Sequence, residues 1–188
     1  MDRRPPGHPR PDHRAGRLNA VPALPRVRLD GYGEDDLDLE RRLNEPEMRA
    51  FLSPSESDEK VVARHRKYLG LAVERVGQMF RITSLTTGDV VGSIGYWERE
   101  WQGETVYETG WGILPEFWGH GYASAAAVAV VAAAAARGTH LSIHAYPKIA
   151  HAASNAVCRK AGFTLLGECD FEYPKGTQIR CNDWSHPL

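Results

Sequence analysis

The most constraining feature of the chain is the segment 115–123, which contains two closely spaced glycines. It follows a strand-forming run at 105–114 and precedes an alanine-rich run that reaches about Arg137. Gly119 and Gly121 can adopt positive φ and let the backbone come close to a ligand. A helix that begins here offers unpaired N–H groups and the positive end of its dipole. The segment is therefore typical of a cradle for a phosphate or pyrophosphate.

Two common phosphate-binding motifs fit this loop poorly. A Walker motif requires Gly-Lys-Ser/Thr, and no such triplet follows. The dinucleotide fingerprint requires a third glycine and an acidic residue about 20 positions later. Ser124 occupies the place of that glycine, and Thr139-His140-Leu141 stands where the acid is expected. Both nucleotide interpretations are weakened.

The loop resembles instead the coenzyme A loop of the GNAT superfamily of N-acetyltransferases, whose pattern is Arg/Gln-x-x-Gly-x-Gly/Ala. Here the pattern becomes Trp-x-x-Gly-x-Ala, with tryptophan in the Arg/Gln place. The form Trp-Gly-x-Gly-Tyr-Ala is similar to the branch of ribosomal-protein N-terminal (alanine/serine) acetyltransferases. The resemblance implies coenzyme contacts at Ile113, Leu114, Trp118, Gly119, His120, Gly121, Tyr122, Ala123 and Ser124.

Two further segments are similar to the same family. Residues 151–163, ending in Gly-Phe, resemble the family's next helix and strand, and residues 171–184 resemble the closing hairpin of this branch. The matches span about residues 27–187. They imply the GNAT fold of the α/β (α+β) class: a mixed, mostly antiparallel seven-stranded sheet with helices on both faces and a splayed central strand pair.

Periodicity and turn residues predict the order of the elements. Strands are expected at 26–32, 79–85, 90–97, 104–114, 141–146, 163–173 and 177–184, and helices near 35–43, 48–52, 55–69, 123–137 and 152–161. His65 falls on an apolar helix face and is expected to pack. Gly110 and Gly112 favour a β-bulge in the central strand, the alternative being that they make room for tryptophans.

Residues 1–26 differ from the rest in composition. They hold six prolines, six arginines and two histidines, with little apolar periodicity. Such a segment buries too little surface to offset the entropy of ordering. We predict a disordered Arg/Pro-rich tail at 1–26 and an acetyltransferase domain at 27–188, with a nucleic-acid-binding arm as the alternative for the tail.

Charge and cysteine content narrow the class of protein. The chain carries −1 in all and the tail +4, so residues 27–188 carry −5. An acidic body suits a cationic amine better than a polyanion such as nucleic acid. The odd number of cysteines and the absence of a CxxC pair or secretory segment favour a cytoplasmic protein, and the alanine run is too short to span a bilayer, so no membrane partner is expected. Either a monomer or a homodimer is compatible with the sequence.

Acetyl transfer from a thioester requires a neutral amine, a stabilised oxyanion and a leaving thiolate that is protonated or held. An α-amino group has a pKa of about 8 and a lysine about 10.4, so a terminal amine needs only a modest base. The resemblance implies direct attack on acetyl-CoA in a ternary complex without an acetyl-enzyme. The main-chain N–H near Ile113 would then face the thioester oxygen.

Two glutamates are candidates for the general base. Glu108 lies mid-strand, where many relatives keep a catalytic glutamate, and shares a strand face with Gly110 and Gly112. Glu172 resembles an acidic residue assigned as base in the ribosomal-protein branch, after a one-residue gap. Glu108 ranks slightly above Glu172, and for each the alternative is a solvated strand glutamate.

The family's usual proton donor is a tyrosine four residues before the Gly-Phe glycine, and Cys158 holds that place here. The branch resemblance implies Ser154 as donor, with helix capping as the alternative. Cys158 as an acyl-accepting nucleophile has no base placed beside it, so buried filler is favoured. His151 replaces an asparagine that contacts pantetheine, and its ring or the amide of Asn155 is expected to substitute.

No metal is expected. His140 and His144, on one face of the predicted strand, and His151 do not make a zinc site, because no cysteine or acidic cluster completes the ligand set. Three tryptophans are expected in the core or along the wall of the acceptor site: Trp97, Trp101 and Trp111.

The sequence thus predicts an acetyl-CoA-dependent N-acetyltransferase acting on a primary amine. Branch resemblance favours a protein or peptide N-terminus over an antibiotic, polyamine or other small amine. A non-catalytic acyl-CoA sensor stays open, because the family tyrosine and asparagine are both replaced.

Overall fold

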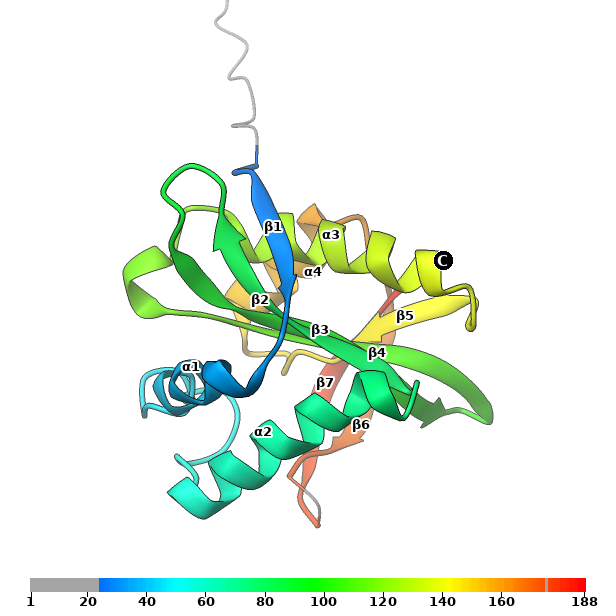
Figure 1. Cartoon of the computed structure of the whole chain (residues 1–188). Helices are drawn as coiled ribbons and strands as arrows, with labels where there is room; N and C mark the ends of the chain where they lie inside the picture. Colours follow the sequence, from blue (N-terminus) through cyan, green and yellow to red (C-terminus); the bar gives the residue numbers. More distant parts are fainter. Residues whose placement is uncertain (1–23, 175) are drawn as a thin grey trace, which may run out of the picture.

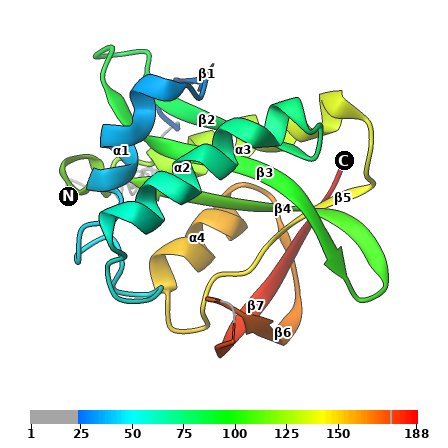
Figure 2. The same cartoon turned by 60° about the horizontal axis from the view of Figure 1, so that its bottom comes forward.

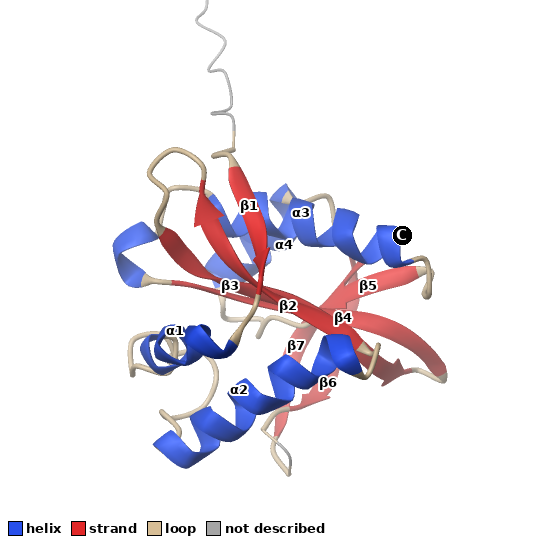
Figure 3. Cartoon of the chain, in the orientation of Figure 1, coloured by secondary structure: helices blue, strands red, loops and turns tan. Residues whose placement is uncertain are grey.

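The computed structural model describes residues 24–174 and 176–188. They form one seven-stranded sheet in the order β1-β2-β3-β4-β5-β7-β6 (Figures 1 and 3). All neighbouring strands are antiparallel except β4 and β5, which are parallel. The strands are β1 Val27–Gly31, β2 Gly77–Ser84, β3 Val90–Trp101, β4 Glu104–Ile113, β5 Ser142–Ala145, β6 Thr164–Glu172 and β7 Gln178–Pro187; the helices are α1 Leu37–Arg42, α2 Asp58–Val73, α3 Tyr122–Arg137 and α4 Ala152–Lys160.

Helices cover both faces of the sheet. α3 and α4 lie on one face and α1 and α2 on the other, as Figures 1 and 2 show from two sides. α3 packs on β1, β3 and β4 through small side chains, and Ala126, Ala127 and Ala134 have no exposed surface. Small residues let the helix approach the sheet closely, which explains the long alanine run. No described helix is long and apolar enough to cross a membrane.

The central strands separate after a short contact. β4 and β5 pair only at Tyr107–Ile143 and Glu108–His144. Beyond this point β4 follows β3 to its end at Ile113, whereas β5 follows β7, and the Asn182 N–H donates to the Pro147 carbonyl. The predicted splayed strand pair is therefore confirmed.

The predicted bulge at Gly110 and Gly112 is wrong. β3 and β4 pair without a register shift. A Cβ at Gly110 would lie 3.1 Å from Trp97 Cη2, and one at Gly112 would lie 2.9 Å from Leu43 Cδ2. The glycines make room for a tryptophan and for the α1 segment, which places the α1 and α2 face on the same side of β4 as Glu108.

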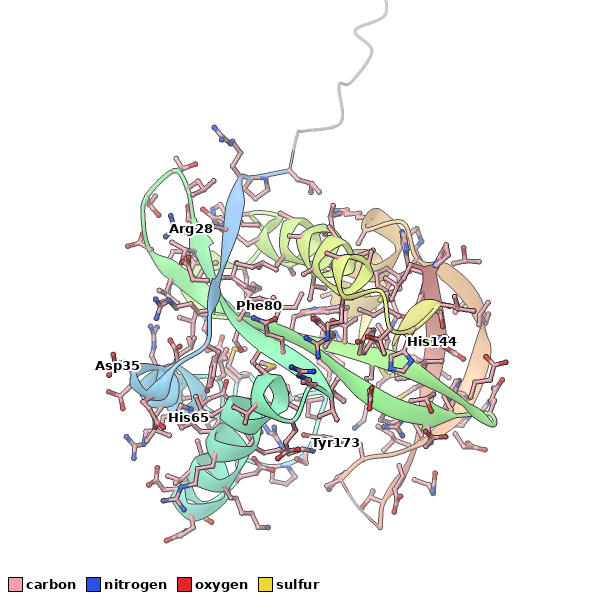
Figure 4. All side chains as sticks on the ribbon, turned by 45° about the vertical axis from the view of Figure 1, so that its right-hand side comes forward. Arg28, Asp35, His65, Phe80, His144 and Tyr173 are labelled. Carbon is pink, nitrogen blue, oxygen red and sulfur yellow. The ribbon has the colours of Figure 1, made fainter. Side chains whose placement is uncertain are left out.

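Other expectations have mixed outcomes. The helix expected at 48–52 is a series of turns. His65, labelled in Figure 4, is buried on α2 with its Nδ1 2.7 Å from the Tyr32 hydroxyl, so it packs as predicted. The tail predicted at 1–26 lies outside the described residues except for 24–26, and its disorder stays a prediction.

The close contact of α3 with the sheet gives a stability test. Ala126→Leu should lower the free energy of unfolding by about 1–3 kcal/mol, because a larger side chain has no space there. Ala132→Leu, at an exposed position of the same helix, is the matched control and should change it by less than about 0.5 kcal/mol. Urea unfolding of both variants measures the difference, and equal effects would contradict the packing argument.

Candidate active site

The glycine loop has the geometry that an anion cradle needs. Gly119 and Gly121 have φ of 78° and 84°, in the region that favours glycine. Gly121 is the N-cap of α3 and supplies no side-chain cap. The first N–H groups of α3, which begins at Tyr122, therefore have no partner from the N-cap side chain. Pro25 lies beside this turn, since a Cβ at Gly121 would come within 3.1 Å of Pro25 Cδ. Ala123 follows in this turn with its side chain half-buried, and Ser124 is buried.

Trp118 gives the loop a hydrogen bond where the family pattern has arginine or glutamine. Its indole N–H donates to the Ile113 carbonyl at 2.5 Å, although the side chain is 45% exposed. The bond ties the loop to the end of β4. His120 is exposed at the tip of the loop, and the buried Leu114 donates its N–H to the Val91 carbonyl on β3.

The direction of the Leu114 hydrogen bond fixes the orientation of the β4 backbone. Alternate residues of a strand direct their N–H and C=O groups to opposite neighbours. Trp111 and Ile113 therefore direct theirs away from β3, into the opening that β5 has left. The Ile113 carbonyl already accepts the Trp118 indole N–H, and the Ile113 N–H faces the opening. An extended ligand arm can pair with this edge as an added strand would.

The N-terminus of α4 lies beside the segment between α1 and α2. His151 is its N-cap, and Nδ1 accepts a bond from the Ser154 N–H at 3.4 Å. The imidazole also stacks on Phe51, with ring centroids 4.2 Å apart. Burial lowers the pKa of His151, which favours the neutral ring. Ser154 is half-buried in the first turn of the helix.

Asn155 has a structural environment instead of the free amide expected from the sequence. Its Nδ2 donates to the carbonyls of Lys148 and His151 at 3.0 and 2.9 Å. Its Oδ1 accepts from Asn182 at 2.6 Å and from the Trp184 indole at 2.9 Å. The amide is thus fully used in holding α4 on β7 and leaves nothing for a coenzyme.

Glu108 lies at the branch point of the sheet, on the face opposite α3. Trp97, Glu108, His144 and Ser185 are successive register partners across β3, β4, β5 and β7. Only 14% of the Glu108 side chain is exposed, and its carboxylate accepts from Arg99 at 2.8 Å. Burial raises the pKa of Glu108, and the ion pair with Arg99 opposes that rise.

Glu172 is not brought to this cluster. It is exposed at the end of β6, and Oε1 accepts from the Gly176 N–H at 2.7 Å. Neighbouring strand residues point to opposite faces. Phe171 faces Arg99, with its ring centroid 4.0 Å from the guanidinium carbon, so Glu172 points away from Glu108.

His140 and His144 lie on opposite faces of the sheet. His140 packs edge-on against Tyr107, on the α3 face, and bonds Glu98 at 2.9 Å. His144, labelled in Figure 4, lies on the Glu108 face with Nδ1 2.7 Å from Asp183. The expectation that both histidines share one strand face is wrong, because His140 precedes the short β5. Within 24–174 and 176–188, no three potential ligands gather as a metal site.

Cys158 and Trp111 pack in the core, whereas Trp97 and Trp101 lie on the side of the sheet that carries Glu108. Cys158 is fully buried, and burial raises the pKa of its thiol to about 12, which disfavours a nucleophilic thiolate. Trp97 and Trp101 lie on the Glu108 side, where they contact Tyr68 and Asp183. Trp111 packs against the core on the α3 face and cannot wall the same site.

Sequence reasoning missed Arg99, Tyr146 and Phe51. The Arg99 guanidinium lies over three aromatic rings, of which Tyr146 is one. The one local indication in the sequence was the spacing of two residues along β3, which places Arg99 on the same face as Trp97 and Trp101. Two surface cavities of about 560 and 290 Å³ adjoin the segment between α1 and α2; the smaller also reaches the β6–β7 hairpin and is lined by Ser53, Pro54, Ser55, Glu56, Ser57, Lys60 and Pro174.

The environment of Asn155 predicts a stability effect. Asn155→Ala leaves the buried Trp184 indole without its acceptor and should lower the free energy of unfolding by about 1–3 kcal/mol. Ser154→Ala is the matched control on the same turn and should stay within about 0.5 kcal/mol of the wild type. Denaturant titration followed by tryptophan fluorescence measures both. Equal stability of all three proteins would show that the Asn155 bonds do not hold α4.

Solved structures share this architecture at low sequence identity. RimL, a ribosomal L7/L12 α-N-protein acetyltransferase in complex with coenzyme A, matches with a TM-score of 0.71 at 20% identity, over 86% of this chain and 94% of that chain. An acetyltransferase from Salmonella typhimurium that modifies the N-terminal serine of L7/L12 gives 0.69 at 20%, over 86% and 95%. Spermidine N-acetyltransferase from Vibrio cholerae, with coenzyme A and spermine, gives 0.68 at 14%, over 86% and 95%.

Sequence comparisons give the family. A comparison with curated proteins finds no match. The acetyltransferase (GNAT) domain family matches residues 26–164, which include the glycine loop, the alanine-rich helix and α4. The chain belongs to the GNAT acetyltransferase family.

Proposed function

We propose that this acetyltransferase moves the acetyl group of acetyl-CoA to the α-amine of a protein or peptide N-terminus. The observation that carries the proposal is the separation of β4 and β5 between the α3 loop and Glu108. It opens the β4 backbone on one side and places a buried carboxylate at the branch point. A thioester bound along the open β4 backbone would meet an amine bound at Glu108 at this branch point.

The coenzyme is assigned to the α3 face. Its pyrophosphate would bind the N–H groups at the start of α3, where the helix dipole favours an anion. Its pantetheine arm would pair with β4 at Trp111 and Ile113. The Ile113 N–H would then stabilise the oxyanion, because it faces the opening and is held by a rigid strand.

Glu108 is the proposed base. The amine loses a proton toward Glu108 as its nitrogen attacks the thioester carbonyl, and the C–S bond breaks when the tetrahedral intermediate collapses. Arg99 favours the ionised carboxylate at neutral pH in spite of its burial. Ser154 would donate to the departing sulfur. Glu172 takes no part, because it points away and bonds the hairpin turn.

A small cationic amine is the second candidate acceptor. Residues 27–188 carry a net charge of −5, which attracts amines in general. The fold is similar to both an N-terminal serine acetyltransferase and a spermidine acetyltransferase, so similarity alone supports neither acceptor over the other.

Coenzyme binding tests the cradle. Gly121→Asp should abolish measurable heat with coenzyme A in calorimetry, because a carboxylate would face the diphosphate and the residue has φ of 84°. Gly138→Asp is the control for the positive φ, because Gly138 has φ of 68° at the opposite end of the same helix, away from the cradle. A Cβ at Gly121 would also lie 3.1 Å from Pro25 Cδ, whereas one at Gly138 meets nothing within 4 Å, so Gly121→Ala controls for that contact. Unchanged affinity in Gly121→Asp, with the protein folded, would remove the basis for the site.

Acetyl transfer tests the base. Glu108→Gln should reduce kcat/KM for peptides beginning with Ser or Ala by about 10²–10⁴-fold without changing coenzyme affinity. The remaining rate should rise with pH as the amine deprotonates, near a pKa of about 8. Thiol release across pH 6–9 measures both. Glu172→Gln should behave as wild type; a large loss there, with Glu108→Gln unaffected, would reverse the assignment.

A further inference from the structure

Arg99 is held beside the proposed base by three aromatic rings. Its guanidinium carbon lies 4.0 Å from the ring centroid of Phe171, 5.5 Å from that of Tyr146 and 5.8 Å from that of Trp101. Trp101 is fixed in turn, because its indole donates to the buried Asp183 at 2.9 Å. The guanidinium is therefore placed by packing on several strands and is more than a mobile counter-ion of Glu108.

Two polar groups in this cluster lack partners among the described residues. Arg99 uses Nη1 for Glu108, and its buried Nε–H has no acceptor. The Tyr146 hydroxyl is also buried without a partner. Burial and the nearby Asp183 and Glu108 carboxylates raise the pKa of Tyr146, so the phenol keeps its proton and can donate. Buried donors without acceptors are costly, and a site that keeps two of them is arranged for a ligand.

These groups distinguish between kinds of amine. A polyamine offers only donors and positive charges, so it would leave both donors unpaired and face the Arg99 charge at short range. A peptide N-terminus carries a carbonyl oxygen on the carbon next to its amine-bearing Cα. With the amine at Glu108, the nearby donors are those of Arg99, which bonds Glu108 at 2.8 Å, and of Tyr146, whose ring centroid lies 5.5 Å from the Arg99 guanidinium carbon.

We infer that Arg99 and Tyr146 bind the carbonyl oxygen of the residue whose amine is acetylated, and so restrict the acceptor to α-amino-acyl groups. The inference rests on the proposed function and narrows it. Arg99 has two roles in this arrangement: Nη1 keeps Glu108 ionised, and Nε–H aligns the substrate. Tyr146 has only the second role, since no described group bonds its hydroxyl.

The test compares two acceptors that differ in the carbonyl. Alanyl peptides carry it, and 2-phenylethylamine does not; kcat/KM is expressed per neutral amine to remove the pKa difference. Tyr146→Phe should reduce kcat/KM for the peptide by about 3–10-fold, and Arg99→Gln by about 10–100-fold, as expected for neutral and charged hydrogen bonds. Tyr146→Phe should leave the rate with 2-phenylethylamine within about 2-fold of wild type. Arg180→Gln, an exposed arginine on β7, is the control without effect on either amine.

The outcomes separate the inference from the function beneath it. Equal losses on both amines in Tyr146→Phe, or a wild-type preference for spermidine over the peptide, would overturn carbonyl recognition and leave an acetyltransferase in place. No turnover of any amine by the wild type would overturn the proposed function itself. Tyr146→Phe leaves the Arg99–Glu108 pair intact, so its result stands even if Arg99→Gln perturbs the fold.

Discussion

The site depends on how the sheet divides its hydrogen bonds. β5 bonds β7 along its whole length and continues beside it through the Lys148–Cys181 bridge, whereas β4 stays with β3. Each central strand is thus satisfied on its outer side, and only two residue pairs join them. The inner edge of β4 keeps backbone groups that need partners. Asn155 reinforces the separation by bonding α4 to β7.

In the proposed mechanism, the same division places the two substrates on opposite faces. The glycine loop and α3 lie on one face, where open N–H groups favour an anion. Glu108 and the aromatic rings around Arg99 lie on the other face, which α1 and α2 cover. Glu108 can serve both faces because it stands at the last residue pair before the strands part. Although residues 27–188 carry a net negative charge, Arg99 places a positive charge beside the proposed base.

Features set by local sequence were predictable, and those set by register were not. The Gly119–Gly121 turn, the alanine-rich helix and the end of α4 at Gly162, with φ of 87°, follow from residue preferences over a few positions. The packing role of Gly110, the direction of Trp111 and the bonds of Asn155 depend on which residues lie across the sheet. Glu108 was a candidate from the family resemblance, and period-two alternation placed it on one face with the glycines. The position of Arg99 beside it depends on the pairing of β3 with β4.

The departures from the family pattern are compatible with catalysis. Trp118 replaces a polar residue, and its uncharged indole ties the loop to Ile113. Cys158 cannot act as the missing tyrosine, since it is fully buried and its thiol has a pKa raised to about 12. Yet an alkyl thiol such as cysteine has a pKa of about 8.5, so a leaving thiolate near neutral pH needs a hydrogen bond more than full proton transfer. In the proposed mechanism the Ser154 hydroxyl would supply that hydrogen bond. The demanding step is then the deprotonation and alignment of the amine, and the buried Glu108 carboxylate and the unpaired Arg99 and Tyr146 donors lie on that side.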